Sequence, residues 1–167
     1  MISEQLKFEV ENWIKHDPDK KTAEQLSTWL KEGNEEELNR CFSGFLQFGT
    51  AGLRGSLGPG PSCMNRAVVS RTAAGIAKFM KKNNLKSVVI GRDARFGSIE
   101  FAQDSAEILA GAGMRTYVLP RELPTPVLAF AVKKLKVDVG IMVTASHNPA
   151  TDNGYKVYLG GDVNGIS

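Results

Sequence analysis

The sequence predicts an α/β fold in which a mixed, mainly parallel sheet is sandwiched between helices and preceded by an N-terminal helical extension. Three observations lead to this prediction. From residue 45 onward, short apolar runs alternate with segments of helical spacing. The run at 137–143 is apolar almost throughout, which is typical of a strand covered on both faces. The first forty residues, by contrast, carry helical spacing only.

Residues 1–43 are predicted to form the extension as three short amphipathic helices. Ser3 is placed to cap the first helix. Thr22 opens a capping box for the second helix, which Gly33 ends. Asn34 is the expected start of the third helix. We expect this region to pack as a helical appendage on the remaining residues, 44–167.

The first α/β elements follow the extension. Residues 45–57 read as strand-like pieces interrupted by glycines, and 58–61 form a tight turn or loop. Asn65 is expected to cap a long helix that ends near Asn83, and 87–91 form a short strand.

A second helix is expected to open at Ser98 and to close near Gly111 or Gly113. The apolar spacing of these two helices points one set of side chains inward. That set is Val68, Val69, Thr72, Ile76, Phe79 and Met80 in the first helix, and Ile99, Ala102, Ala106 and Leu109 in the second.

Three more strands and a third helix complete an order in which strands and helices alternate. Residues 114–119 form a strand, and Thr125 caps a helix that has Pro126 in its first turn. The last two strands are 137–143 and 155–159. This alternation is the pattern of an α/β sheet.

Ligands of such sheets bind at the carboxyl ends of the strands. Three loops lie at those ends: 91–98, 120–125 and 144–154. We therefore expect a functional site to be assembled from these loops.

The bulk composition is that of an ordinary globular protein. Of the 167 residues, 42% are hydrophobic and 23% charged, and the net charge is +3. No apolar run reaches the roughly 20 residues of a membrane span, and the N-terminus does not resemble a signal peptide. Cys41 and Cys63 do not form a disulfide framework and lack metal-ligand spacing. We expect a cytoplasmic protein that binds neither membrane nor nucleic acid.

The loop after the apolar strand carries the residues best suited to chemistry. Ser146 is followed by His147, Asn148 and Pro149, and Pro149 disfavours a helical backbone at Asn148. A serine there can accept a phosphoryl group, which brings a charge of about −1.5 to −2 and needs cationic neighbours. His147 and Lys156 are candidates for that role. The alternative is a simple turn in which polar side chains satisfy backbone groups.

A hydrolase nucleophile is disfavoured at this serine. Thr144 and Asn148 stand where the Gly-x-Ser-x-Gly elbow needs glycine. His147 is adjacent in sequence, and the other histidine, His16, lies in the helical extension.

Two further segments are rich in glycine and arginine. In FGTAGLRG at 48–55, glycine lets the backbone approach a ligand closely and Arg54 offers a fork of donors to phosphate. An ordinary glycine-rich turn is the alternative reading. In 91–98, Arg92 and Arg95 flank Asp93, and ion pairing that locks the loop is favoured over anion binding.

Together these motifs resemble those of the α-D-phosphohexomutases. TASHNP at 144–149 and NGYKVY at 153–158 resemble the family's phosphoserine loop, and the 48–55 segment resembles its N-terminal signature. The likeness covers roughly residues 40 to 160. The helical extension and the loop sequence DNGYK at 152–156 are most similar to the phosphoglucomutase-2, phosphopentomutase and bacterial phosphomannomutase branch.

The resemblance implies a four-domain enzyme of which residues 44–167 are domain I, with the other domains absent from this chain. The family interconverts hexose 1-phosphate and 6-phosphate. A phosphoserine gives its phosphoryl group to the substrate, and the bisphosphorylated sugar that forms returns the other one. A sugar 1,6-bisphosphate is therefore both intermediate and activator, and the isolated chain is expected to be inactive.

The resemblance also implies residue roles. Ser146 is the phosphoryl carrier and, through its phosphate, a ligand of Mg²⁺, whose other ligands come from an absent domain. Arg54, His147 and Lys156 are the remaining catalytic residues. The substrate and phosphate ligands implied are Thr50, Gly52, Asn148 and Arg92.

Two other functions remain open from the sequence. One is a non-catalytic domain that binds phosphates or a partner. The other is a sugar-phosphate phosphatase, in which water takes the phosphoryl group from the serine. The identity of the sugar depends on a domain that this chain lacks.

Overall fold

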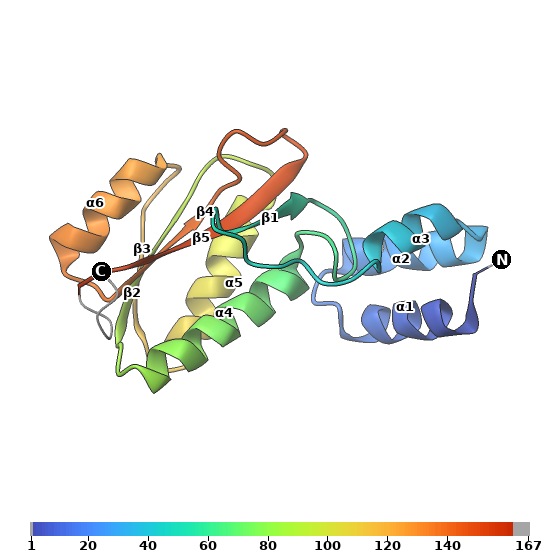
Figure 1. Ribbon diagram of the computed structural model, residues 1–167, viewed down its shortest axis with the longest axis horizontal. Coiled ribbons are helices and arrows are strands. Elements are labelled where there is room, and N and C mark those ends of the chain that lie inside the picture. The colour runs from blue at the N-terminus through green and yellow to red at the C-terminus, as the bar shows by residue number, and fades with distance from the viewer. Residues whose placement is uncertain (1, 162–167) are drawn as a thin grey trace.

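The computed structural model describes residues 2–161. Figure 1 shows an elongated molecule, with three N-terminal helices at one end and a layered α/β unit at the other. The sheet has five strands in the order β1-β5-β4-β2-β3. Their bounds are Leu53–Ser56 for β1, Ser87–Arg92 for β2, Arg115–Val118 for β3, Val139–Val143 for β4 and Asp152–Leu159 for β5.

The sheet is mixed, which confirms the predicted fold class. Strand β2 pairs in parallel with β3 and β4, whereas β5 is antiparallel to both β4 and β1. Only residues 144–151 join β4 to β5, too few for the crossover that a parallel pair requires. The chain therefore reverses directly, and the loop that carries Ser146 is this reversal.

Helices cover both faces of the sheet. Helices α4 (Arg66–Lys82) and α5 (Ser98–Gly111) lie on one face, and α6 (Thr125–Leu135) lies on the other (Figure 1). Strand residues alternate between them, since Val88 packs in the core with α4 and α5 while Val89 packs against α6. This two-sided burial explains the continuous apolar run of β4, whose five residues are all buried.

The N-terminal helices form a smaller unit with its own core. They are α1 (Glu4–His16), α2 (Lys20–Glu32) and α3 (Glu35–Cys41). Val10, Leu26 and Leu38 are fully buried among them. The Ser3 side chain accepts a hydrogen bond from the Leu6 backbone N–H at 3.2 Å, as expected for the cap of α1.

The predicted caps of two helices, α2 and α6, were wrong by three residues and one residue. Helix α2 is capped by Asp19, whose carboxylate accepts from the Lys21 N–H, so that Thr22 lies inside the helix. Helix α6 is capped by Pro124, so that Thr125 is its first residue and not its cap. Helix α5 begins at Ser98, as predicted, after Gly97 in a left-handed conformation. In α2, Asp19 lies about one turn before Thr22 and caps the helix in place of the predicted capping box.

The prediction of strand-like pieces throughout 45–57 was largely wrong. Only Leu53–Ser56 form a strand that pairs with the sheet. Before it, Gly49 and Gly52 exchange backbone hydrogen bonds of 3.1 Å in a tight turn. Glycine gives this stretch the freedom to turn back on itself instead of extending.

Two side chains predicted to point inward are exposed. Phe79 of α4 and Ile99 of α5 have exposed fractions of 41% and 55%. In α5 the buried face includes polar residues such as Ser98, Asp104 and Ser105, which apolar spacing does not detect. The true buried stripe is therefore rotated away from Ile99.

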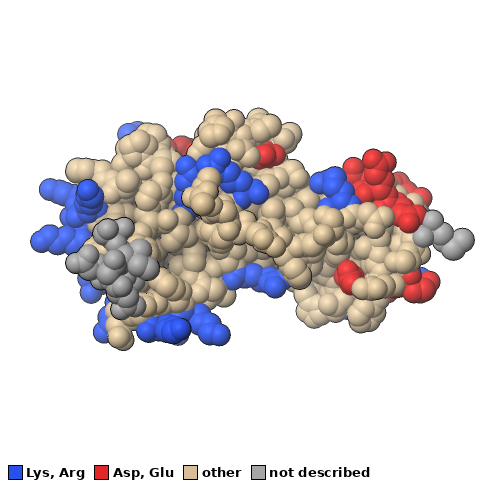
Figure 2. Space-filling view, viewed as in Figure 1, with Lys and Arg blue, Asp and Glu red and all other residues tan. Residues whose placement is uncertain are grey.

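Charge is distributed unevenly along the molecule. Residues 1–43 contain six Lys or Arg against ten Asp or Glu, whereas residues 44–167 contain fifteen against eight. Figure 2 shows acidic side chains gathered at the end formed by α1–α3 and basic ones over the sheet end. Among residues 2–161, no helix combines the length and apolar character that crossing a membrane requires.

Candidate functional site

The loop after β4 presents Ser146 to solvent. The Ser146 backbone has a φ of 56°, in the left-handed region that serine seldom adopts. Its N–H donates to the Thr144 hydroxyl at 3.0 Å, and the Asn148 N–H donates to the Ala145 carbonyl at 3.1 Å. These bonds fix a tight turn with the serine at its exposed tip.

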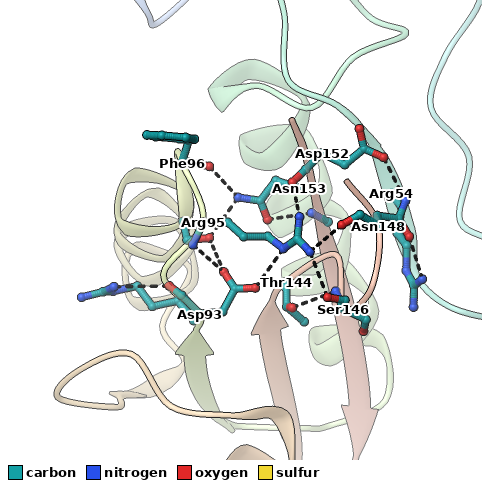
Figure 3. Close-up of polar contacts among 12 residues, drawn as sticks. Arg54, Asp93, Arg95, Phe96, Thr144, Ser146, Asn148, Asp152 and Asn153 are labelled. Atoms are coloured by element: carbon teal, nitrogen blue, oxygen red, sulfur yellow. Dashed lines mark hydrogen bonds and ion pairs between the residues drawn. The ribbon is translucent and has the colours of Figure 1, made fainter. Parts of the chain in front are cut away.

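Arg95, from the loop between β2 and α5, donates hydrogen bonds to the backbone of this turn. Its Nη1 donates to the carbonyls of Pro149 at 2.6 Å and Asp152 at 3.0 Å. Its Nη2 donates to the carbonyls of Ser146 at 2.9 Å and Asn148 at 2.8 Å. Figure 3 shows the guanidinium among these backbone groups. One cation thus binds four carbonyls of the serine loop.

Arg95 is itself positioned by Asp93, with an ion pair of 3.3 Å between Arg95 Nε and the carboxylate (Figure 3). The same carboxylate accepts from the Ser98 hydroxyl at 2.8 Å. Asn153, fully buried, donates to the Phe96 carbonyl and the Ser98 hydroxyl. Hydrogen bonds therefore join the loop after β2 to the loop after β4. Within residues 91–98, Arg95 forms with Asp93 the kind of ion pair that the sequence favoured.

Lys156 of β5 places its ammonium group next to the Ser146 hydroxyl. Its Nζ lies 2.6 Å from Ser146 Oγ. Partial burial, and secondly the positive charge of Arg54, lower the pKa of Lys156. The ammonium can donate a hydrogen bond to the hydroxyl and gives up a proton more readily than a solvated lysine.

Arg54 of β1 contacts the serine loop through Asn148. Its Nη1 donates to Asn148 Oδ1 at 3.2 Å, and the Asn148 amide in turn donates to the Asp152 carboxylate at 2.9 Å. Its Nε is the one buried side-chain nitrogen or oxygen in residues 2–161 without a hydrogen-bond partner. A buried donor of this kind is rare and can be satisfied by a ligand.

A depression of about 410 Å³ is lined by Arg54 and Lys156. Its walls also include Thr50 and Gly52. Gly52 has a φ of 93°, and a Cβ there would lie 2.5 Å from the Tyr155 carbonyl oxygen, so glycine is required. The structure thus gathers four of the residues proposed from the sequence around one hollow beside the serine loop.

Two proposed site residues have other surroundings. Arg92, at the end of β2, forms an ion pair with Glu122 in the loop after β3. His147 is exposed next to Ser146. Neither lines the depression.

Sequence reasoning did not identify Arg95 as the residue that binds the serine loop. Its partners lie 51 to 57 positions away, and all of them are carbonyl oxygens that every residue possesses. The one available signal was topological, since an arginine after β2 lies beside the end of the neighbouring strand β4.

The described residues, 2–161, contain no group of three or more His, Cys, Asp or Glu side chains that could hold a metal ion. On this chain the exposed Ser146 hydroxyl, once phosphorylated, would present oxygen atoms of the kind that Mg²⁺ prefers.

Comparison with known proteins gave consistent matches. Residues 46–165 match the family model described as phosphoglucomutase/phosphomannomutase, alpha/beta/alpha domain I. The phosphopentomutase of Homo sapiens is 40% identical over 160 residues, covering 90% of this chain and 26% of that protein. A probable phosphomannomutase of Haemophilus influenzae is 57% identical over 98 residues, covering 58% of this chain and 20% of that protein.

Solved structures agree with these matches. The crystal structure of a putative phosphomannomutase from Thermus thermophilus superimposes with a TM-score of 0.65 at 35% identity. The match covers 70% of this chain and 26% of that one. The chain therefore spans about a quarter of the length of the relatives it matches.

Proposed function

The chain belongs to the phosphoglucomutase/phosphomannomutase family, and on this premise we propose that it carries the phosphoserine of a sugar-phosphate mutase. Its relatives are named phosphopentomutase, phosphomannomutase and phosphoglucomutase, which supports a phosphosugar as the substrate class. In the proposed reaction the complete protein interconverts hexose 1-phosphate and 6-phosphate in the cytoplasm. Ser146 holds the phosphoryl group between the two half-reactions.

The observation that carries the proposal is the 2.6 Å contact between Lys156 Nζ and the exposed Ser146 Oγ. A phosphoserine brings a charge of about −1.5 to −2, which an adjacent ammonium stabilises. The unpartnered Nε of Arg54 supplies a second donor close by. Phosphoryl transfer depends mainly on positioning and charge neutralisation, and this loop contributes to both.

The chemistry of the first half-reaction follows from these contacts. A hydroxyl oxygen of the bound sugar monophosphate attacks phosphorus on Ser146, and the bond from phosphorus to Oγ breaks. Lys156 donates a proton or a hydrogen bond to the departing Oγ, a role suited to its lowered pKa. His147, exposed beside the serine, is the proposed acceptor of the sugar hydroxyl proton.

The second half-reaction reverses these roles. The bisphosphorylated sugar presents its other phosphate, Ser146 Oγ attacks that phosphorus, and the product leaves as the isomeric monophosphate. Thr50, Gly52 and Asn148 border the reacting groups and are proposed to bind phosphate oxygens, together with Arg92 if its ion pair opens.

The proposal includes partners outside this chain. Further domains of the same polypeptide would hold the sugar, and Mg²⁺ would be bound by the phosphate on Ser146 and by side chains of such a domain. When bound, the ion would neutralise charge on the phosphoryl oxygens.

The test is labelling of the full-length protein that contains this chain. Incubation with glucose 1,6-bisphosphate, followed by peptide mapping with mass spectrometry, is expected to place phosphate on Ser146 and to leave Ser146→Ala unlabelled. Phosphate on another serine, or label retained in Ser146→Ala, would contradict the assignment.

The same samples distinguish the alternative functions. A mutase converts glucose 1-phosphate into the 6-phosphate with little release of inorganic phosphate. Release that exceeds isomer formation indicates a phosphatase, and binding without labelling indicates a non-catalytic domain.

A further inference from the structure

A pair of buried cysteines lies away from the serine loop, where the helical extension meets the α/β unit. Cys41 is the last residue of α3, and Cys63 lies in the segment that leads from β1 to α4. Their Sγ atoms are 3.8 Å apart. The exposed fractions are 0% and 1%, and both thiols are free.

The backbone around the two thiols is already held together. The Ser62 N–H donates to the Cys41 carbonyl at 3.1 Å, and the Ser62 hydroxyl donates to the Gly44 carbonyl at 2.9 Å. A Cβ at Gly60 would lie 2.6 Å from the Cys41 carbonyl oxygen, so this close approach requires glycine. Because folding has closed the loop between the cysteines, their sulfurs meet at a high effective concentration.

The two thiols differ in their electrostatic surroundings. Arg40 Nη1 lies 3.6 Å from Cys63 Sγ. The hydrogen bond shared with Cys41 lowers the pKa of Cys63, and the charge of Arg40 acts in the same direction. The same shared hydrogen bond raises the pKa of Cys41. Cys63, which also has the Arg40 guanidinium beside it, is therefore the thiol of the pair that loses its proton more readily, and the thiolate is the reactive form of cysteine.

We propose that Cys41 and Cys63 form a reversible thiol–disulfide modification site whose oxidant is a small peroxide such as hydrogen peroxide. Cys63 thiolate attacks one peroxide oxygen, the O–O bond breaks, and hydroxide leaves while Cys63 becomes a sulfenic acid. Cys41 then loses its proton and attacks Cys63 Sγ. The S–S bond forms as hydroxide leaves and takes up that proton as water, so two thiols are oxidised and the peroxide is reduced.

The order of these steps follows from the position of Arg40 beside Cys63 and from the short distance between the two sulfurs. A negative charge on Cys63 favours the protonated form of Cys41. Conversion of Cys63 to the neutral sulfenic acid removes that charge and frees Cys41 to react. Both sulfurs are buried, so an oxidant reaches them when the segment around them opens locally, and a small peroxide needs the smallest opening.

The first experiment measures the product. The 167-residue chain is treated with hydrogen peroxide, blocked with iodoacetamide and mapped without reduction. The expected product is a peptide that links Cys41 to Cys63 within one chain and is reversed by dithiothreitol. Oxidation to sulfinic acid without this linkage, or disulfides only between chains, would refute the proposal.

A second experiment measures, at redox equilibrium, how strongly folding favours the bond between the two cysteines. The fraction of intramolecular disulfide is determined across ratios of oxidised to reduced dithiothreitol, for the folded chain and for the chain in guanidinium. The folded chain is expected to reach half oxidation at a ratio at least about tenfold lower. An equal or higher ratio would mean that the folded state resists the bond, which overturns the proposal.

Two matched variants assign the roles. In Cys41→Ser, Cys63 is expected to stop at the sulfenic acid, which dimedone traps. In Cys63→Ser, the remaining Cys41 should react with peroxide at least about tenfold more slowly. Circular dichroism of both variants verifies that they fold. Equal rates would contradict the assignment of Cys63 as the attacking thiol.

Discussion

At the scale of single residues, the conformation of Ser146 depends on a side chain from another loop. A left-handed backbone at a non-glycine residue costs about 1 kcal/mol and persists only where its surroundings impose it. Here Arg95 supplies the constraint through four carbonyls, two of which belong to Ser146 and Asn148. The position of the proposed phosphoryl carrier is therefore set largely by a residue that does not touch the reacting atoms.

The substitution Arg95→Lys tests this dependence. Lysine keeps the charge but cannot reach four acceptors in one plane, so loop carbonyls lose their donors. We expect phosphate labelling of Ser146 to slow at least about tenfold, and unfolding in denaturant to become easier by about 1–3 kcal/mol. Arg121→Lys, at an exposed position in the loop after β3, is the matched control. Unchanged labelling with reduced stability would show that Arg95 serves the fold alone.

Lys156 gives rise to a prediction about pH. Burial and the charge of Arg54 lower its pKa, so the ammonium is lost at a lower pH than for an ordinary lysine. The rate of Ser146 labelling should therefore decline on the alkaline side earlier than a normal lysine would allow. Lys156→Ala should remove this alkaline limb and slow labelling strongly, with little change in circular dichroism. If the alkaline decline in the labelling rate persists in Lys156→Ala, it reports the titration of another group.

At the scale of elements, the start of α4 joins a helix to the loop that precedes it. Asn65 Oδ1 accepts from the Val68 N–H at 2.9 Å. Its amide donates to the carbonyls of Gly58 at 2.9 Å and Gly60 at 2.7 Å. One buried side chain thus caps the helix and anchors the glycine-rich loop.

Asn65→Ala should lower the free energy of unfolding by roughly 2–4 kcal/mol, because it removes the cap and takes the amide donor away from the loop carbonyls. Asn65→Asp separates the two contributions, since it keeps the oxygen that caps the helix and loses the amide donor. Denaturant unfolding is the measurement. Equal stability of the Asp variant and the original chain would mean that the loop carbonyls do not depend on Asn65.

Much of the fold could be predicted at this scale because burial on both sides of a sheet leaves a clear pattern. The apolar β4 and the Asn65 cap of α4 were predicted from a few neighbouring residues. Errors arose where the decisive partner was remote or polar. Ile99 was assigned to the core because Ser105 and Asp104, which are buried instead, look like surface residues.

The candidate site shows the same division. Ser146 and Lys156 are ten positions apart on adjoining parts of one hairpin, so sequence could suggest their meeting. Arg54 and Asn148 are 94 positions apart and meet because β1 pairs with β5, a pairing that no local pattern reveals. Whether these residues have the proposed catalytic roles stays a prediction.

At the scale of the whole molecule, we predict that the 167-residue chain has no useful mutase activity alone. In residues 2–161 no cluster of side chains could hold a metal ion, and the depression beside the serine is open. Transfer requires charge neutralisation and a sugar held in two orientations.

A coupled isomerisation assay with magnesium and glucose 1,6-bisphosphate tests this prediction on the chain and on the full-length protein. We expect the full-length protein to be faster by far more than tenfold. Turnover by the chain within about tenfold of it would show that the site is not shared between domains.

The separation of charge along the elongated molecule has a consequence for encounter with a substrate. With an acidic helical end and a basic sheet end (Figure 2), the chain has a permanent electric dipole moment along its length. A phosphosugar dianion, the proposed substrate, is therefore expected to be deflected from the helical end and drawn toward the α/β unit, which carries the serine loop. At physiological salt the field is screened beyond about 8 Å, so added salt should slow capture of the anion far more than its escape.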